Sequence, residues 1–194
     1  NLDEIVKWFD ENGFEPFKVM RTLPENDNDA TKYKVEIEEL KENYRLLRRC
    51  FESKEKFSAE EVVKLVKLAD YYMAIDDKMI RVIEVFLKAV RESTEPLPNL
   101  KINPHFHEAL QLYLGERIHV GIQLSYFEVK LNSWETSLDN KQFTLKLLRN
   151  LASCYGKIKI ENLTIDEENF LQVQELLSGH LSAVSFENCF FLQE

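Results

Sequence analysis

Two histidines near the middle of the chain are the residues best suited to metal chemistry. His105 and His107 flank a phenylalanine, and Glu108 follows them directly. Imidazole and carboxylate groups are common zinc ligands, and on a β-strand the two histidines would share one face. After Pro104, however, we expect a helix, in which side chains two residues apart diverge. The sequence therefore predicts no metal site here, and no cofactor.

The acidic stretch 24–32 is a second metal candidate. Four oxygen-bearing side chains fall at the ligand spacing of a calcium-binding loop: Asp27, Asp29, Thr31 and Glu38. The sixth position holds Lys32, where the sharp turn of such a loop requires glycine. The following Val35–Ile37 alternates like a short strand. We interpret the stretch as a solvated loop.

The rest of the sequence lacks the motifs of common enzymes. It contains no phosphate-binding glycine loop, nucleophile elbow or zinc-protease motif, and only five glycines. A net charge of −9 argues against a nucleic-acid partner, because binding to phosphates requires a basic face. No apolar run approaches the roughly 18–20 residues of a membrane span. We therefore expect a non-enzymatic protein that acts through its surface.

One short apolar pattern occurs twice near the end of the chain, 26 residues apart (181 − 155). The two series are Tyr155, Ile158, Ile160, Leu163 and Ile165, then Leu181, Val184, Phe186, Cys189 and Phe191. The pair Glu161-Asn162 recurs as Glu187-Asn188 at the same offset. Between the series, Asp166–Gly179 has helical apolar spacing after an acidic start. Each unit is predicted to be a strand followed by a helix, which must stack on a copy of itself.

This pattern resembles the leucine-rich repeat family, whose unit reads L-x-x-L-x-L-x-x-N/C-x-L. Asparagine stands one place earlier than in that family, so only Cys189 matches its Asn/Cys position. A further copy is predicted upstream in the same frame, at His119, Ile122, Leu124, Phe127 and Val129. A degraded copy is predicted from Leu97, with a strand near Leu100–Ile102 and a helix through Glu108–Leu114. Lys130–Ser137 would be an insertion before a helix at Gln142–Ser153.

The N-terminal half reads as helices. The predicted elements are a helix at Leu2–Glu11 ending at Gly13, an apolar segment at Phe14–Leu23, a strand at Val35–Ile37, and helices over Leu40–Phe51, Ser58–Ala69 and Lys78–Arg91. From Tyr33 to Val90 this order resembles the second half of the BTB/POZ and Skp1-like fold. The residues that carry this resemblance are Leu65, Leu68, Ala69, Asp70, Tyr71, Ile75 and Asp76. The strands that form the first half of that family are missing, and a plain helical bundle is the alternative.

The predicted fold class is α/β. Residues 1–92 would form a helical, partly BTB/Skp1-like domain, residues 93–99 a linker, and residues 100–194 a short repeat solenoid with a parallel sheet. Residues between the strand apolars would point outward and form a protein-binding face. These candidates are Lys101, Gln123, Ser125, Lys157, Lys159, Glu161, Ser185 and Glu187.

The function predicted from these features is that of an adaptor that recognises another protein. The BTB/Skp1 resemblance implies self-association of the N-terminal half, or docking on a cullin scaffold in a ubiquitin ligase. Three cysteines without a C-x-x-C pattern read as buried reduced thiols and favour the cytoplasm. The alternative is a secreted effector or surface protein, in which Asn1 follows signal cleavage and the sequon Asn162-Leu163-Thr164 becomes relevant.

Overall fold

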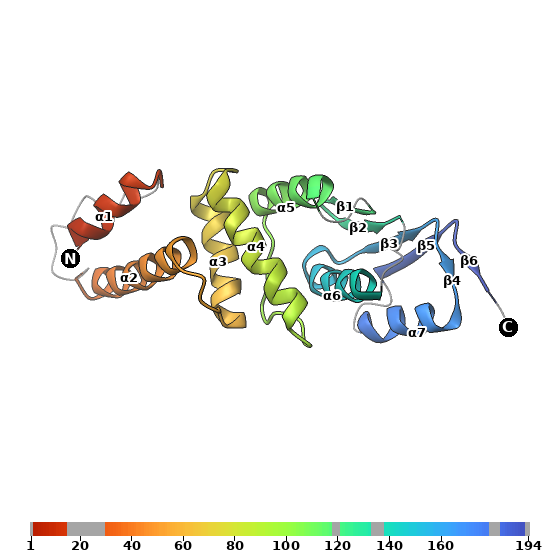
Figure 1. The fold of residues 1–194 in the computed structure, drawn as a ribbon. Coiled ribbons are helices and arrows are strands. Elements are labelled where there is room, and N and C mark those ends of the chain that lie inside the picture. The colour runs from red at the N-terminus through yellow and green to blue at the C-terminus, as the bar shows by residue number, and fades with distance from the viewer. Residues whose placement is uncertain (1, 15–29, 118–120, 133–137, 179–182, 193–194) are drawn as a thin grey trace.

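The computed structural model describes residues 2–14, 30–117, 121–132, 138–178 and 183–192. Within these ranges it mixes helices with a small, mainly parallel sheet, which confirms the predicted α/β class. The molecule is elongated, with the first helices at one end and the last strands at the other (Figure 1). No helix among the described residues is long and apolar enough to cross a membrane. The division into two domains stays a prediction.

The described part of the N-terminal half contains four helices: α1 (Leu2–Glu11), α2 (Ala30–Glu52), α3 (Ala59–Tyr72) and α4 (Asp77–Glu92). The strand predicted at Val35–Ile37 is wrong, because these residues belong to α2. Three alternating residues cannot outweigh the helical spacing that follows them, which places Leu40 and Leu47 in the core. The predicted segment Phe14–Leu23 lies outside the described residues apart from Phe14, which is buried.

The N-termini of α3 and α4 are capped by Ser58 and Asp76. The Ser58 hydroxyl accepts a hydrogen bond from the Glu61 backbone N–H, while the Glu61 carboxylate accepts one from the Ser58 backbone N–H. The Asp76 carboxylate accepts a hydrogen bond from the Lys78 N–H. Such caps satisfy N–H groups that have no partner inside the helix. They explain why these two helices begin where the sequence predicts.

The segment between α4 and α5 (Pro104–Arg117) forms no strand, so the strand predicted near Leu100–Ile102 is wrong. Pro98 and Pro104 flank these residues, and Asn99 has a left-handed φ of 58°, which interrupts the extended backbone that a strand needs. Leu97 and Leu100 are nevertheless buried. Their burial shows that this predicted linker packs on the protein.

Helix α6 (Leu138–Tyr155) holds the linker in place. The buried Asn150 side chain accepts a hydrogen bond from the Leu97 N–H at 2.8 Å. Arg149 lies 3.4 Å from Glu95, and Lys146 donates to the Arg91 carbonyl at 2.9 Å. Because α4 also packs directly against α5 and α6, the two halves share one continuous cluster of buried side chains.

The four-stranded sheet has the order β1-β2-β3-β5. Its strands are β1 (Ile122–Ser125), β2 (Glu128–Leu131), β3 (Ile158–Glu161) and β5 (Val184–Glu187). β1 is antiparallel to β2, whereas β2, β3 and β5 are parallel. Helix α5 packs against β1 and α6 against β2 (Figure 1). The apolar side chains of the strands therefore meet the helices on one face of the sheet.

The predicted upstream copy is placed in the wrong register. Val129 of β2, rather than Ile122 of β1, pairs in parallel with Ile158. Tyr126 and Phe127 form a two-residue loop, which can join only antiparallel strands, because a parallel connection needs a crossover of about a dozen residues. The predicted insertion Lys130–Ser137 therefore begins inside β2, and Phe127 lies exposed at the loop rather than in the core.

The 26-residue spacing of the last two units is confirmed by strand pairing. Ile158 pairs with Val184 and Ile160 with Phe186, each 26 residues apart (184 − 158). A second small sheet repeats this spacing, because β4 (Thr164–Ile165) pairs in parallel with β6 (Phe190–Phe191). Helix α7 (Glu167–Leu176) lies between the two units in sequence and packs on α6 and β4.

The repeated asparagines shape the turns that join these strands. Asn162 has a φ of 57° between β3 and β4, and Asn188 has a φ of 52° between β5 and β6. Asparagine enters this left-handed region more readily than most residues. The Asn162 N–H also donates to the Glu187 carbonyl at 3.0 Å, which ties the two units together.

Candidate protein-binding surface

The face of the sheet opposite the helices is polar. In β1, Ile122 and Leu124 are buried, whereas Gln123 and Ser125 are exposed. Residues that pair directly across strands share a face, and Gln123, Lys130, Lys159 and Ser185 form one such row. Glu128 pairs with Ser125, and Glu161 with Glu187, in the rows on either side. We call this set of side chains the polar sheet face.

The structure brings together most of the residues predicted for a binding face. Seven of the eight candidates lie on β1, β3, β5 or directly before β3: Gln123, Ser125, Lys157, Lys159, Glu161, Ser185 and Glu187. Lys101 is the exception. It is exposed, but it belongs to the linker before α5 and lies outside the sheet, because no strand forms there.

Two members of the polar sheet face were missed from the sequence, Glu128 and Lys130. Both lie on β2, where they alternate with the buried Val129 and Leu131. The sequence does contain a signal for a second strand here, because apolar and polar residues alternate in Glu128–Leu131 as they do in β3. The predicted insertion at Lys130–Ser137 divides this alternating segment, so the strand is not recognised from the sequence.

Ion pairs connect the strands across this face. The Lys159 ammonium lies 2.7 Å from the Glu161 carboxylate and also contacts the Glu187 carboxylate. Lys130 lies 3.4 Å from Glu161. The Lys157 ammonium lies 3.2 Å from the Glu128 carboxylate. These three lysines and three glutamates therefore form a charge-balanced surface in two groups of ion pairs, although the whole chain has a net charge of −9.

The centre of this network is partly covered by its neighbours. The side chains of Lys159 and Glu161 are only 19% and 15% exposed. The hydrogen bonds that the Lys159 ammonium donates to Glu161 and Glu187 raise its pKa, and the hydrogen bond donated by Lys159 lowers the pKa of the Glu161 carboxyl. Both groups are thus held in their charged forms at neutral pH. The network presents charges in fixed positions on rigid strands, as a recognition surface requires.

An exposed aromatic pair borders the polar sheet face. Tyr126 is 61% exposed and Phe127 72% exposed, and their rings lie edge to face with centroids 4.6 Å apart. The Ser125 hydroxyl accepts a hydrogen bond from the Glu128 N–H and donates to the Glu128 carbonyl, which closes the loop. Exposed aromatic residues on a rigid turn are typical anchors of protein interfaces. We call this pair the aromatic tip.

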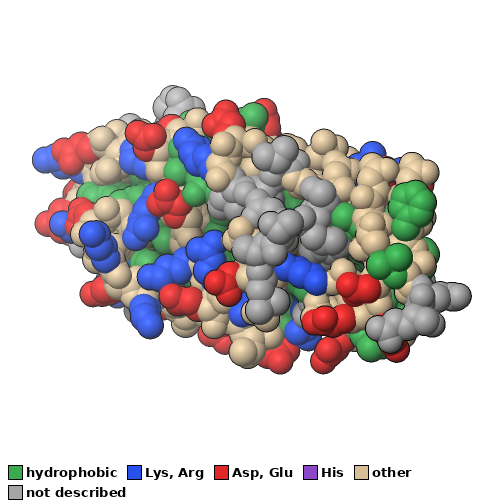
Figure 2. All heavy atoms as spheres, turned by 45° about the vertical axis from the view of Figure 1, so that its right-hand side comes forward, with side chains coloured by type: hydrophobic (Ala, Val, Ile, Leu, Met, Phe, Trp, Pro, Cys, Tyr) green, Lys and Arg blue, Asp and Glu red, His purple; other side chains and the backbone are tan. Residues whose placement is uncertain are grey.

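The aromatic tip was also missed from the sequence, because Phe127 was counted among the core residues of a repeat. The available signal was a two-residue connection between two alternating segments, which is typical of a β-hairpin. On the face drawn in Figure 2, charged side chains of both signs are interspersed, and hydrophobic side chains are exposed in small groups at both ends.

The histidine pair makes separate contacts. The His105 Nε2 atom lies 2.5 Å from the Met73 carbonyl oxygen, whereas the His107 Nδ1 atom lies 2.7 Å from the Tyr155 hydroxyl. Burial lowers the pKa of His107. The helix start predicted at Pro104 is confirmed, and the Asp70 carboxylate accepts a hydrogen bond from the N–H of Phe106 in its first turn. Among the described residues, no three His, Cys, Asp or Glu side chains gather as metal ligands would.

The four residues with calcium-loop spacing do not all lie in a loop. Thr31 and Glu38 both lie within helix α2, whereas Asp27 and Asp29 lie outside the described residues.

Of the three cysteines, Cys50 is buried and Cys154 and Cys189 are half-buried, and all three thiols are free. Burial raises the pKa of Cys50 to about 11.

No protein-family model, curated protein or solved structure matches this chain. The resemblances to leucine-rich repeats and to the BTB/Skp1 fold therefore stay predictions from the residues.

Proposed function

We propose that this chain is a non-enzymatic recognition module that binds a protein partner through the polar sheet face and the aromatic tip. The observation that supports this most is the position of Tyr126 and Phe127, which are exposed on a closed hairpin loop directly beside the ion-paired strands. An exposed aromatic pair costs solvation free energy in the unbound protein and contributes strongly when it is buried in a partner.

The chemistry of the partner surface follows from these groups. An apolar recess would accept the two rings, while hydrogen-bonding groups around it would meet the row of Gln123, Lys159 and Ser185. Because the face carries balanced charge, it favours a partner surface of mixed polarity over one of uniform charge. This arrangement of an apolar centre and a polar surround is common in protein interfaces.

The family resemblances extend this proposal. The leucine-rich repeat resemblance suggests a client-recognition role for the polar sheet face. The BTB/Skp1 resemblance suggests that the helical half self-associates or docks on a cullin scaffold, in a cytoplasmic adaptor. The alternative, a secreted effector or surface protein, is favoured by one observation: the sequon asparagine Asn162 is exposed in its turn. Mass spectrometry of the native protein for a glycan at Asn162 separates the two settings.

The proposal is tested by affinity capture followed by binding measurements with the purified partner. The Tyr126→Ser/Phe127→Ser variant is compared with Tyr71→Ser, which removes a 75%-exposed aromatic residue from α3. Hot-spot aromatic residues typically contribute 2 kcal/mol or more, so we expect the tip variant to bind about 30-fold more weakly and Tyr71→Ser to bind normally.

A second variant probes the polar strands. Lys157→Glu reverses a 55%-exposed charge whose ion pair is with Glu128, and it leaves the covered Lys159 in place. We expect it to weaken the same partner by severalfold. A partner that binds the tip variant and Lys157→Glu as tightly as the wild type would refute this function.

A further inference from the structure

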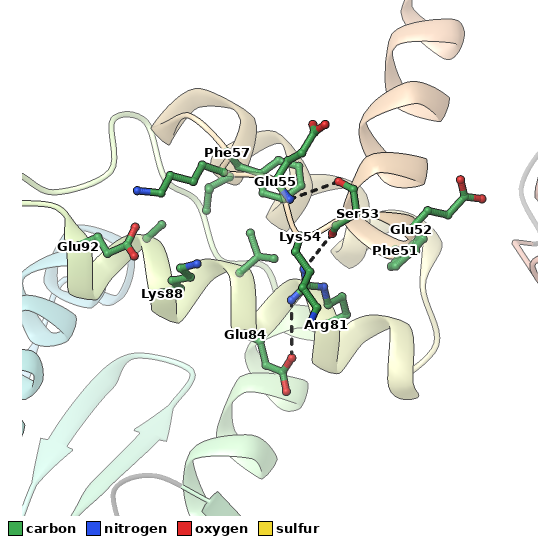
Figure 3. A pocket seen from close by; sticks show the side chains of 14 residues that line it. Phe51, Glu52, Ser53, Lys54, Glu55, Phe57, Arg81, Glu84, Lys88 and Glu92 are labelled. Carbon is green, nitrogen blue, oxygen red and sulfur yellow. Dashed lines mark hydrogen bonds and ion pairs between the residues drawn. The ribbon is translucent and has the colours of Figure 1, made fainter.

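A hollow of about 440 Å³ lies between α4 and the segment that joins α2 to α3. In Figure 3, Arg81, Glu84, Lys88 and Glu92 extend along α4 on one side, and Lys54, Glu55 and Phe57 lie on the other. Its apolar lining consists of Phe51, Phe57, Val62, Val85 and Ala89. This volume is within the range of known ligand sites, and it would accommodate one large apolar side chain of a ligand.

The wall of the hollow is held in shape by Arg81. Its guanidinium donates to the Cys50 carbonyl at 3.0 Å and to the Ser53 carbonyl at 3.3 Å. These carbonyls lie at the C-terminal end of α2, where a helix presents partial negative charge. The hollow therefore exists before any ligand arrives.

Most acidic side chains around the hollow are already engaged by arginines. The pairs are Glu52 with Arg48 at 2.8 Å, Glu55 with Arg49 at 3.0 Å and Glu84 with Arg81 at 4.0 Å. These pairs reduce the negative charge that the rim offers to a ligand. Glu92 is the acidic lining residue for which the described part of the chain provides no ion pair.

The lysines around the hollow are not engaged. Lys54, Lys56 and Lys88 line it, are exposed, and form no ion pair or hydrogen bond within the described ranges. Among the lining groups that form no ion pair, three ammonium groups therefore face one carboxylate, whereas the lining as a whole holds four basic and four acidic side chains. This excess of unpaired ammonium groups coincides with the hollow. We call the site the lysine-rimmed pocket.

We propose that the lysine-rimmed pocket binds an acidic segment of a partner protein, which inserts one apolar side chain between Phe57 and Val85 and places carboxylates beside the lysines. The apolar lining would contribute nothing to a bare anion or to the phosphate backbone of a nucleic acid, whereas it would bury an apolar side chain. A peptide with an apolar anchor and flanking acids satisfies both halves of the pocket. This site is separate from the polar sheet face and does not depend on it.

The probe is a fluorescein-labelled peptide of sequence Glu-Asp-Glu-Leu-Asp-Glu-Glu, followed by fluorescence anisotropy with the full chain. Two matched peptides separate the contributions, one with serine in place of leucine and one with glutamines in place of the acids. Because the pocket needs both an anchor and charge, we expect each matched peptide to bind about tenfold more weakly. Higher salt is expected to weaken the acidic peptide.

Charge-matched protein variants locate the site. Lys54→Gln/Lys56→Gln/Lys88→Gln removes three positive charges at the pocket, while Lys7→Gln/Lys64→Gln/Lys67→Gln removes three elsewhere on the helical half. Both changes alter the net charge equally, so long-range repulsion is the same in the two variants. We expect about tenfold weaker binding for the pocket variant and less than about twofold for its control.

A filling variant tests the apolar half. Ala89→Leu adds bulk at a half-buried position of the lining and leaves every lysine in place. We expect it to weaken the leucine peptide about tenfold and to leave the serine peptide unchanged. Absence of saturable binding, equal losses in the pocket variant and its charge-matched control, or equal affinity for the leucine and serine peptides would each overturn the proposal.

Discussion

Replacing Asn162 with alanine is expected to destabilise the fold by about 1 kcal/mol. Asn162 has a φ of 57° at the turn from β3 to β4. An L-residue with a Cβ pays roughly 1–2 kcal/mol in this left-handed region, and asparagine pays less than alanine. Glycine pays no such cost. We therefore expect Asn162→Gly to keep the stability of the wild type to within about 0.5 kcal/mol, because the relieved strain offsets the larger entropy of glycine in the unfolded chain.

The measurement is urea- and heat-induced unfolding followed by circular dichroism. For a chain of this size, 1 kcal/mol corresponds to a fall in Tm of about 2–4 °C. Asn188 provides an internal comparison, because it has the same backbone conformation at the turn between β5 and β6. Those strands are less buried than β3, so we expect a smaller effect for Asn188→Ala.

Two results would refute this reasoning. If Asn162→Ala and wild type unfold together, the left-handed turn carries no conformational cost. If Asn162→Gly is destabilised as much as Asn162→Ala, the asparagine contributes through its side chain rather than through its backbone.

Three further predictions concern stability and reactivity. Leu147→Ala, at a fully buried position of α6, is expected to lower the free energy of unfolding by about 2–5 kcal/mol in urea titrations, against about 0.5 or less for the exposed Leu171→Ala. The Ser58 N–H holds the pKa of Glu61 below its usual range, so this contribution is present above the unfolded pKa, near 4.5, and is lost as pH falls through the folded value. Wild type should therefore lose more Tm than Glu61→Gln between pH 5 and 3, and equal losses would contradict the assignment. Because burial raises the pKa of Cys50 to about 11, thiol titration at pH 8 should modify it only after urea is added, and rapid labelling in the folded protein would count against its burial.

Local interactions were the easiest to read from the sequence. The starts of α3 and α4 were predictable because Ser58, Glu61 and Asp76 act on backbone groups within three residues of themselves. The pairing of β3 with β5 was predictable for another reason, since two units of equal length stack in the register of their repeat.

Long-range arrangements were harder. Ile122–Leu124 and Val129–Leu131 have the same alternation, so apolar spacing alone cannot tell which of them pairs with β3. The polar character of the sheet face follows from that alternation, but its ion pairs depend on which strands are neighbours. The lysine-rimmed pocket combines residues from Phe51 to Glu92 on three helices and a connection, which no local pattern reveals.

The packed linker has a consequence for any partner that reaches both proposed sites. Because Asn150 and Arg149 fasten residues 93–99 to α6, the lysine-rimmed pocket and the polar sheet face keep a constant separation. A single partner could then bind both sites at once, and its two weak contacts would reinforce each other only when the spacer between them matches that separation. Shortening the spacer below the gap would abolish the avidity at once, whereas lengthening it would erode the avidity gradually.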